Sequence, residues 1–149
     1  MSAFRSSKQG ITTTLKLTLI IAILGLTLGA ANATTLMLSG APDRSAAVPL
    51  DGTETNGLAY IFTTPDTGVK QVDFYLNTAP SGTPRLIERV APFDFNATAP
   101  DMSAYAFDTN SLPDGQHTVH AKTYYSNGTN EILSAIFTVN NAAPGFTFS

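Results

Sequence analysis

The 149-residue chain contains no cysteine and no tryptophan. Without cysteine there is no disulfide framework and no metal site built on thiolates, so stability has to come from packing alone. A strongly basic surface is also missing, because the formal net charge is −3. This balance argues against a nucleic-acid partner, which would require a basic face. The length is right for about one domain, since typical domains hold roughly 100 to 150 residues.

Patterns of catalytic and metal-binding residues are missing as well. No Ser, His and acid grouping can be picked out by spacing, and no glycine-rich phosphate loop is present. The two histidines are His117 and His120, and a spacing of three on a strand directs them to opposite faces. We therefore expect no catalytic residue, no metal site made by the histidines and no cofactor.

The first 33 residues have the pattern of an export signal. A basic start is followed by an uncharged apolar run at 17–28 and by small residues that end in Ala31-Asn32-Ala33. These are the three regions of a secretory signal peptide, and they predict cleavage after Ala33. The apolar run is short for a membrane-spanning helix, which needs about 20 apolar residues. Retention of the segment as a membrane anchor is the alternative. A prepilin-type leader cut after Gly10 is less favoured, because the glutamate that usually follows such a cut is missing.

Cleavage would change both the charge and the location of the protein. It would remove the three cations Arg5, Lys8 and Lys16 and so shift the formal net charge from −3 to −6. We expect a protein that is secreted, periplasmic or held at the cell surface, with no membrane attachment after cleavage.

The clearest structural signal is a β-hairpin between Leu112 and Val139. Two runs of alternating polarity, 116–125 and 131–139, are joined by Ser126-Asn127-Gly128-Thr129. An Asn-Gly pair supplies the positive φ angles of a tight hairpin turn. The hairpin therefore predicts antiparallel pairing of two long strands.

Short strands separated by turn residues fill the rest of residues 34–140. In 69–76, Val72, Phe74 and Leu76 share one face, which is typical of a half-buried strand. The inward face of 57–63 is ambiguous from the pattern. With no segment of helical period, the sequence predicts an all-β, antiparallel two-sheet sandwich of about seven strands. The expected strands are 34–39, 57–63, 69–76, 85–90, 93–95, 105–108, 116–125 and 131–139, with an edge segment at 46–50.

Several stretches carry a resemblance to bacterial immunoglobulin-like domains of secreted and surface proteins. They are Val72-Asp73-Phe74-Tyr75-Leu76, Glu88-x-x-Ala91-Pro92-Phe93-Asp94-Phe95, Ala106-Phe107-Asp108-Thr109-x-x-Leu112-x-Asp114-Gly115-x-His117-Thr118 and Ser134-Ala135-x-Phe137-Thr138-Val139-Asn140. The resemblance covers most of residues 36–140 and implies a two-sheet sandwich that serves as a spacer, a binding accessory or an adhesive module. It also implies structural rather than catalytic roles for Asp114, Gly115 and His117, which lie at a corner.

A candidate ligand-binding surface follows from strand parity. If Val119, Ala121 and Thr123 face the core, the side chains that alternate with them face outward, beside Ser134 and Ile136 of the last strand. In an immunoglobulin-like strand order, 69–76 adds two more side chains to this surface. Aromatic and charged groups on one face suit a glycan or a protein ligand, whereas ordinary cross-strand pairs are the plain alternative. The candidate residues are Asp73, Tyr75, His120, Lys122 and Tyr124.

Two weaker patterns leave other functions open. Asp66-Thr67-Gly68 matches the triplet of aspartic proteases, in which two such aspartates share a proton across a dimer. Here, however, Thr63-Thr64-Pro65 precedes the triplet in place of an apolar strand. Eight aspartates in or near loops raise the question of a structural calcium ion, although none lies in a dense ligand run. They are Asp43, Asp51, Asp66, Asp73, Asp94, Asp101, Asp108 and Asp114.

The sequence thus predicts a non-catalytic module for binding or adhesion at the cell exterior. The alternative is a structural subunit that assembles with copies of itself through sheet edges. The tail 141–149, which carries Phe146 and Phe148, would make the contact between copies. An aspartic-type hydrolase using Asp66 is the remote alternative.

Overall fold

A computed structural model describes residues 33–142 of the chain. The predicted signal peptide therefore lies outside the described residues except for Ala33, as do Phe146 and Phe148 of the tail. Within the described part, no helix has the length and apolar character needed to cross a membrane.

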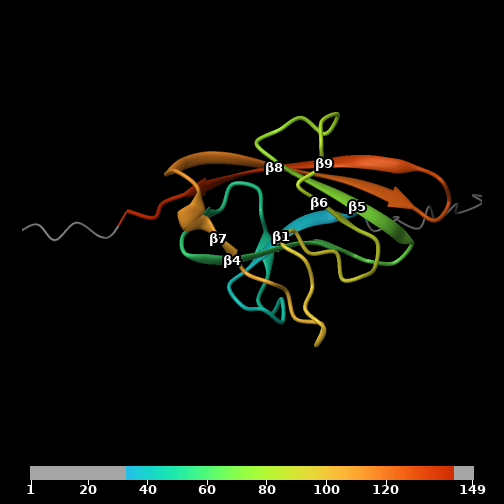
Figure 1. The fold of residues 1–149 in the computed structure, drawn as a ribbon, viewed down its shortest axis with the longest axis horizontal. Helices are drawn as coiled ribbons and strands as arrows, with labels where there is room; N and C mark the ends of the chain where they lie inside the picture. The colour runs from blue at the N-terminus through green and yellow to red at the C-terminus, as the bar shows by residue number, and fades with distance from the viewer. Residues whose placement is uncertain (1–32, 143–149) are drawn as a thin grey trace, which may run out of the picture.

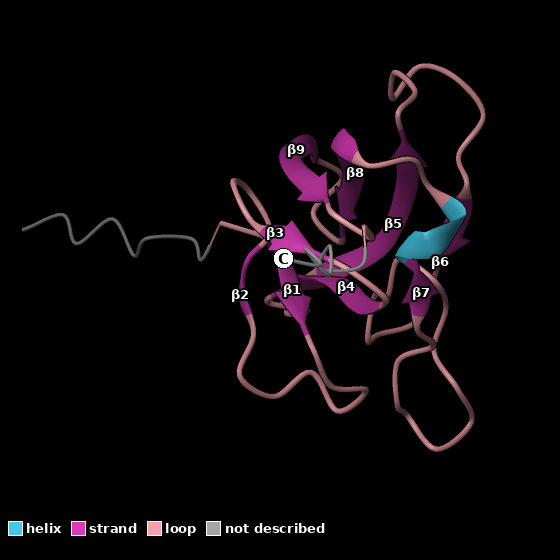
Figure 2. Cartoon of the chain, turned by 90° about the vertical axis from the view of Figure 1, so that its left-hand side faces the viewer, coloured by secondary structure: helices cyan, strands magenta, loops and turns pink. Residues whose placement is uncertain are grey.

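Two β-sheets pack face to face and enclose the core (Figure 1). The four-stranded sheet has the order β2 (Val48–Pro49), β1 (Thr35–Ser39), β4 (Leu58–Thr64) and β7 (Phe107–Asp108). The five-stranded sheet has the order β3 (Glu54–Thr55), β9 (Asn130–Val139), β8 (Gly115–Tyr125), β5 (Val69–Leu76) and β6 (Leu86–Glu88). A single 3₁₀ turn, Thr109–Ser111, is the helical element of residues 33–142, and Figure 2 shows it beside β7.

The strand order identifies the fold as an immunoglobulin-like β-sandwich. Sequential strands cross between the two sheets, with β4 in one sheet and β5 in the other, then β7 in the first and β8 in the second. This Greek-key exchange between two packed sheets is the mark of immunoglobulin-like domains. The predicted fold class is therefore confirmed.

The hairpin formed by β8 and β9 is the longest pairing in the molecule. Its register runs from Gly115 opposite Val139 to Tyr124 opposite Asn130, close to the predicted limits. Val119, Ala121 and Thr123 are fully buried, which confirms the predicted inward face. The alternate residues of β8 therefore face away from the four-stranded sheet.

Aromatic rings fill the centre of the core. Phe95 meets Phe74 edge-to-face at 5.8 Å between ring centroids and Phe107 at 5.1 Å. The guanidinium of Arg85 lies 4.4 Å from the centroid of Phe95 and donates a hydrogen bond to its carbonyl oxygen at 2.6 Å. Because such pairs add attraction beyond the burial of area alone, Phe95 is the main packing centre between the two sheets.

The structure differs from the sequence prediction at two strands and resolves the ambiguous face of a third. Residues 93–95 were predicted as a strand, but they form only an isolated bridge between Asp94 and Phe62. The sheets are antiparallel except where β3 pairs parallel with Thr138 and Val139 of β9, and β3 was not predicted because two residues show no periodicity. In β4, Ala59 and Ile61 belong to the core whereas Leu58 is exposed. The alternation of this strand is ambiguous because Phe62, on the opposite face from Ile61, is also buried. It pairs there with Asp94 through an isolated bridge.

Candidate binding surface

The outer face of the five-stranded sheet brings together the five candidate residues of the sequence analysis. The register places Tyr75 opposite His120 and His120 opposite Ser134. Two residues further along the strands, on the same face, Asp73 lies opposite Lys122. Tyr124 lies in a third row, opposite Gln71. Strand parity thus sets all five on one face.

Asp73 and Tyr75 are nevertheless buried, with only 6% and 4% of their surfaces exposed. They lie in β5, between β8 and β6, so neighbouring side chains flank them on both sides. The β5–β6 connection also rises above this face (Figure 1). Asp73 accepts a 2.6 Å hydrogen bond from the Gln71 amide, and burial raises the pKa of Tyr75. The expectation that these two side chains are displayed to a ligand is therefore wrong.

The accessible part of the face belongs to β8 and β9. The ammonium group of Lys122 lies 5.3 Å from the centroid of the Tyr124 ring, and His120 Nδ1 lies 2.7 Å from Ser134 Oγ. Ile132 and Ile136 are 51% and 48% exposed on the same face. We call this set the β8–β9 face; its members are His120, Lys122, Tyr124, Ile132, Ser134 and Ile136.

The corner residues hold the start of β8 in place. His117 is buried, and its ring nitrogens lie 2.8 Å from the Pro113 carbonyl oxygen and 2.8 Å from the Asn77 side-chain amide. Asp114 accepts a hydrogen bond from the Asn141 backbone N–H at 2.7 Å, and Gly115 has a φ of 124°. These contacts bind the corner to β5 and to the end of β9, so they support the sheet rather than a ligand.

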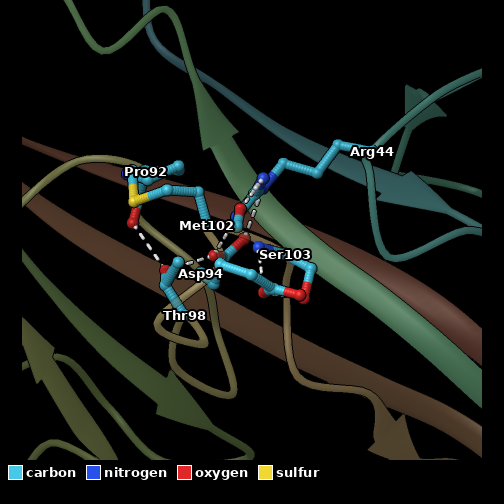
Figure 3. Close-up of polar contacts among 7 residues, drawn as sticks. Arg44, Pro92, Asp94, Thr98, Met102 and Ser103 are labelled. Atoms are coloured by element: carbon cyan, nitrogen blue, oxygen red, sulfur yellow. Dashed lines mark hydrogen bonds and ion pairs between the residues drawn. The ribbon is translucent and has the colours of Figure 1, made fainter.

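A buried ion pair joins two long loops on the opposite side of the molecule (Figure 3). Both Arg44 and Thr98 donate hydrogen bonds to the carboxylate of Asp94, whose side chain is 1% exposed. Arg44 also donates to the Met102 carbonyl oxygen at 3.0 Å. The hydrogen bond with Asp94 is the main cause of the raised pKa of Arg44. This cluster was not predicted, because its two charged members lie 50 residues apart in the sequence.

Asp66 of the Asp-Thr-Gly triplet lies in the turn between β4 and β5, where its carbonyl oxygen accepts a hydrogen bond from Val69 at 3.0 Å. Burial raises the pKa of Asp66; the charge of Arg44 opposes this shift, and the charge of Asp94 adds to it. A protease of this type needs two carboxylates that share a proton. Asp94 is held by Arg44 and Thr98, so it does not serve as the second carboxylate within this chain.

Replacing Asp66 with asparagine is expected to stabilise the domain more at pH 7 than at pH 3. A carboxyl group whose pKa is raised by folding contributes stability that is present below its unfolded pKa and is lost as the pH rises through its folded pKa. Asparagine stays neutral throughout. Urea unfolding of both proteins at the two pH values measures the difference, and a difference that shrinks toward pH 7 contradicts the assignment.

Among residues 33–142, no group of three or more histidine, aspartate or glutamate side chains is arranged to hold a metal ion. The eight aspartates are spread over loops and strands, and several bind local backbone or hydroxyl groups, as Asp101 binds Ser103. The described residues thus offer no support for the calcium site considered from the sequence.

A small cavity opens where the edges of the two sheets meet, between β1 and β9. Its volume is about 140 Å³. Sequence reasoning missed it, because an opening between two sheets depends on how they pack and leaves no pattern in either strand. Its lining includes Thr34, Leu36, Asp51, Leu133, Ser134 and Ala135.

No protein-family profile and no curated protein matches the chain. Solved structures of low similarity include the fibronectin(III)-like modules of Clostridium thermocellum CbhA, with 18% identity, a TM-score of 0.40 and coverage of 64% of this chain and 94% of that one. The endo-beta-1,4-mannanase of Thermotoga petrophila gives 15% identity and a TM-score of 0.42, covering 73% of this chain and 20% of that one. CopC of Methylosinus trichosporium OB3b gives 13% identity and a TM-score of 0.34, covering 63% of this chain and 88% of that one. At these scores the likenesses carry no functional argument.

Proposed function

We propose that this protein is a non-catalytic binding module that works outside the cytoplasm and recognises a protein partner through the β8–β9 face. The observation that carries the proposal is the grouping of exposed Ile132 and Ile136 with Tyr124 and Lys122 on one face of the sheet. Apolar and aromatic side chains gathered on a surface, with polar groups among them, are typical of protein interfaces.

A protein partner suits this face better than a glycan does. Sugar rings stack on free aromatic faces, but Tyr75 is buried and the ring of Tyr124 is already in contact with Lys122. The isoleucines, in contrast, offer apolar area that a protein surface can cover. The glycan alternative is therefore the less favoured form of the binding hypothesis.

The proposed location rests on the sequence of residues 1–33, with its basic start, apolar run and Ala-x-Ala end. A domain that has no cysteine works equally well whatever the redox state of its compartment.

Replacing Lys122 and Tyr124 together with alanine is expected to weaken partner binding by roughly 30-fold or more, as loss of one central hot-spot residue does. Both side chains project outward, so the fold should be kept. The immobilised protein is challenged with the other exported proteins of the source cell and with a glycan panel, and the affinity of the retained protein is then measured. Lys70→Ala with Tyr105→Ala is the matched control, since both residues are exposed elsewhere.

Equal loss in the test and control variants would contradict the assignment of the β8–β9 face. Binding to glycans, without any retained protein, would contradict the choice of a protein partner. Thermal unfolding of both double variants separates either outcome from a loss of folding.

A further inference from the structure

One stretch of sheet edge is left open in the described part of the chain. The backbone of Ile136 is covered at this edge, because its N–H donates to Asp51 Oδ1 and its carbonyl accepts from Gly52. Thr138 is covered in the same way by Thr53. Alternate residues of a strand present their backbone groups to the same edge, so Ile132 and Ser134 point theirs to this edge too. Within residues 33–142 these groups have no hydrogen-bond partner.

An open, apolar edge of this kind is a template for an added strand. Beside it lies the cavity between β1 and β9, where Leu36, Leu133 and Ala135 contribute apolar lining. A cavity of roughly 150 Å³ holds a benzene molecule in a protein interior, and this one is about 140 Å³. The edge thus combines free backbone groups with a partly open, partly apolar hollow whose volume is close to that of a benzene-binding cavity.

The chain itself contains a segment that matches both features. Residues 145–149 read Gly-Phe-Thr-Phe-Ser, uncharged and alternating between aromatic and polar. In an extended strand, Phe146 and Phe148 would share one face, and Thr147 would lie on the other. Such a strand can direct a phenyl ring into the cavity while its backbone pairs with Ser134.

To reach the open edge of its own molecule, this segment would have to turn back past β3 and run antiparallel to β9. Phe146 is four residues beyond Ala142, which allows about 14 Å of extended chain. Ser134 lies roughly 17 Å back along β9 from Val139 alone, and β3 occupies the edge between them. Pairing with the segment of another copy avoids this turn and keeps the added strand parallel to β9.

The positions of the chain ends make such pairing between copies straightforward. Thr34 contacts Tyr125 at the end of β8, whereas Asn141 contacts Asp114 just before β8 begins. The described chain therefore starts and ends at opposite poles of the sandwich (Figure 1). A chain that leaves one molecule can therefore meet the next molecule where β9 begins and run in the same direction as β9. β3 already pairs parallel with β9 in this way.

We propose that the open β9 edge binds residues 145–149 of a second copy as an added parallel strand, with one phenyl ring in the cavity beside β1. The contact joins two different surfaces, so repeated copies form a head-to-tail chain or ring rather than a two-fold dimer. It uses the edge of β9 and is independent of the partner proposed for the β8–β9 face.

The test uses cysteine trapping in the exported protein, which is otherwise free of cysteine. In a protein carrying Ser134→Cys and Thr147→Cys, both thiols lie on the outer side of adjacent strands. We expect a ladder of disulfide-linked multimers on a non-reducing gel, which reductant collapses. The control, Ile87→Cys with Thr147→Cys, places its acceptor on β6 at the other edge of the sheet.

A ladder of equal strength in the control, or a disulfide formed within one molecule, would overturn the proposal. Sedimentation of the cysteine-free protein gives a second measurement. Phe146→Ser with Phe148→Ser is expected to raise the apparent Kd of association about tenfold or more, since burial of a phenyl ring is lost. Thr147→Ser should leave it unchanged. Strictly monomeric wild-type protein, or association that is unaffected by the loss of both rings, would refute the pairing.

Discussion

Replacing Asp94 with alanine is expected to destabilise the domain by about 3–5 kcal/mol, the usual loss when one partner of a buried ion pair is removed. The guanidinium of Arg44 has a side-chain exposure of 15%, so its charge would be left poorly solvated. The Thr98 hydroxyl would lose an acceptor at the same time. For a domain of this size the melting temperature should fall by more than about 10 °C. Urea unfolding and a thermal melt measure the two quantities.

The matched control for Asp94 replaces both charges. Arg44→Met with Asp94→Leu removes the ion pair without leaving a lone charge, and apolar replacement of a buried pair is often neutral. We expect this double variant to be clearly more stable than Asp94→Ala. An Asp94→Ala protein within about 1 kcal/mol of wild type would show that the two loops are held together by other contacts.

Replacing Phe95 with alanine is expected to cost about 3–5 kcal/mol of unfolding free energy, as Phe-to-Ala changes in cores do. The ring is fully buried and makes edge-to-face contacts with Phe74 and Phe107. Its removal leaves a cavity between the two sheets and takes away the surface on which Arg85 rests. Chemical unfolding of the purified variant gives the value directly.

Tyr105→Ala is the control for Phe95, because Tyr105 is an aromatic residue that is 50% exposed. Its loss should change the unfolding free energy by about 0.5 kcal/mol or less. If the two variants proved equally stable, Phe95 could not be the packing centre that the ring contacts indicate.

Sequence periodicity was enough to predict the two-sheet architecture and its longest hairpin. Alternation over ten or more residues identifies a strand and its buried face, as in β8 and β9. An element of two residues such as β3 offers no period, and its parallel pairing with β9 depends on the path of the loop before it. Local pattern therefore sufficed for the long strands and located the short edge strands β2, β6 and β7, but it missed β3.

The candidate surface was predicted only in part, for a different physical reason. Parity gives the face of a sheet on which a side chain lies, and it put Asp73 and Tyr75 on the correct one. Exposure depends in addition on what flanks the strand, and β5 lies inside the sheet. The Arg44–Asp94 pair and the cavity beside β1 arise from contacts between distant segments, which no local spacing encodes.

The opposite positions of the two chain ends also decide how the domain carries mechanical load. A pull on Ala33 and Ala142 acts along the strand axes, because the ends leave from opposite poles (Figure 1). Two backbone hydrogen bonds join β9 to the residues just before β3. Gly52 donates to Ile136 at 2.7 Å, and Thr138 donates to Thr53 at 2.8 Å. Under such a pull these bonds would be sheared together rather than opened one by one. Because forced unfolding is governed by the unfolding rate, the shear of these bonds would add to the tension that the domain withstands, together with the β8–β9 ladder.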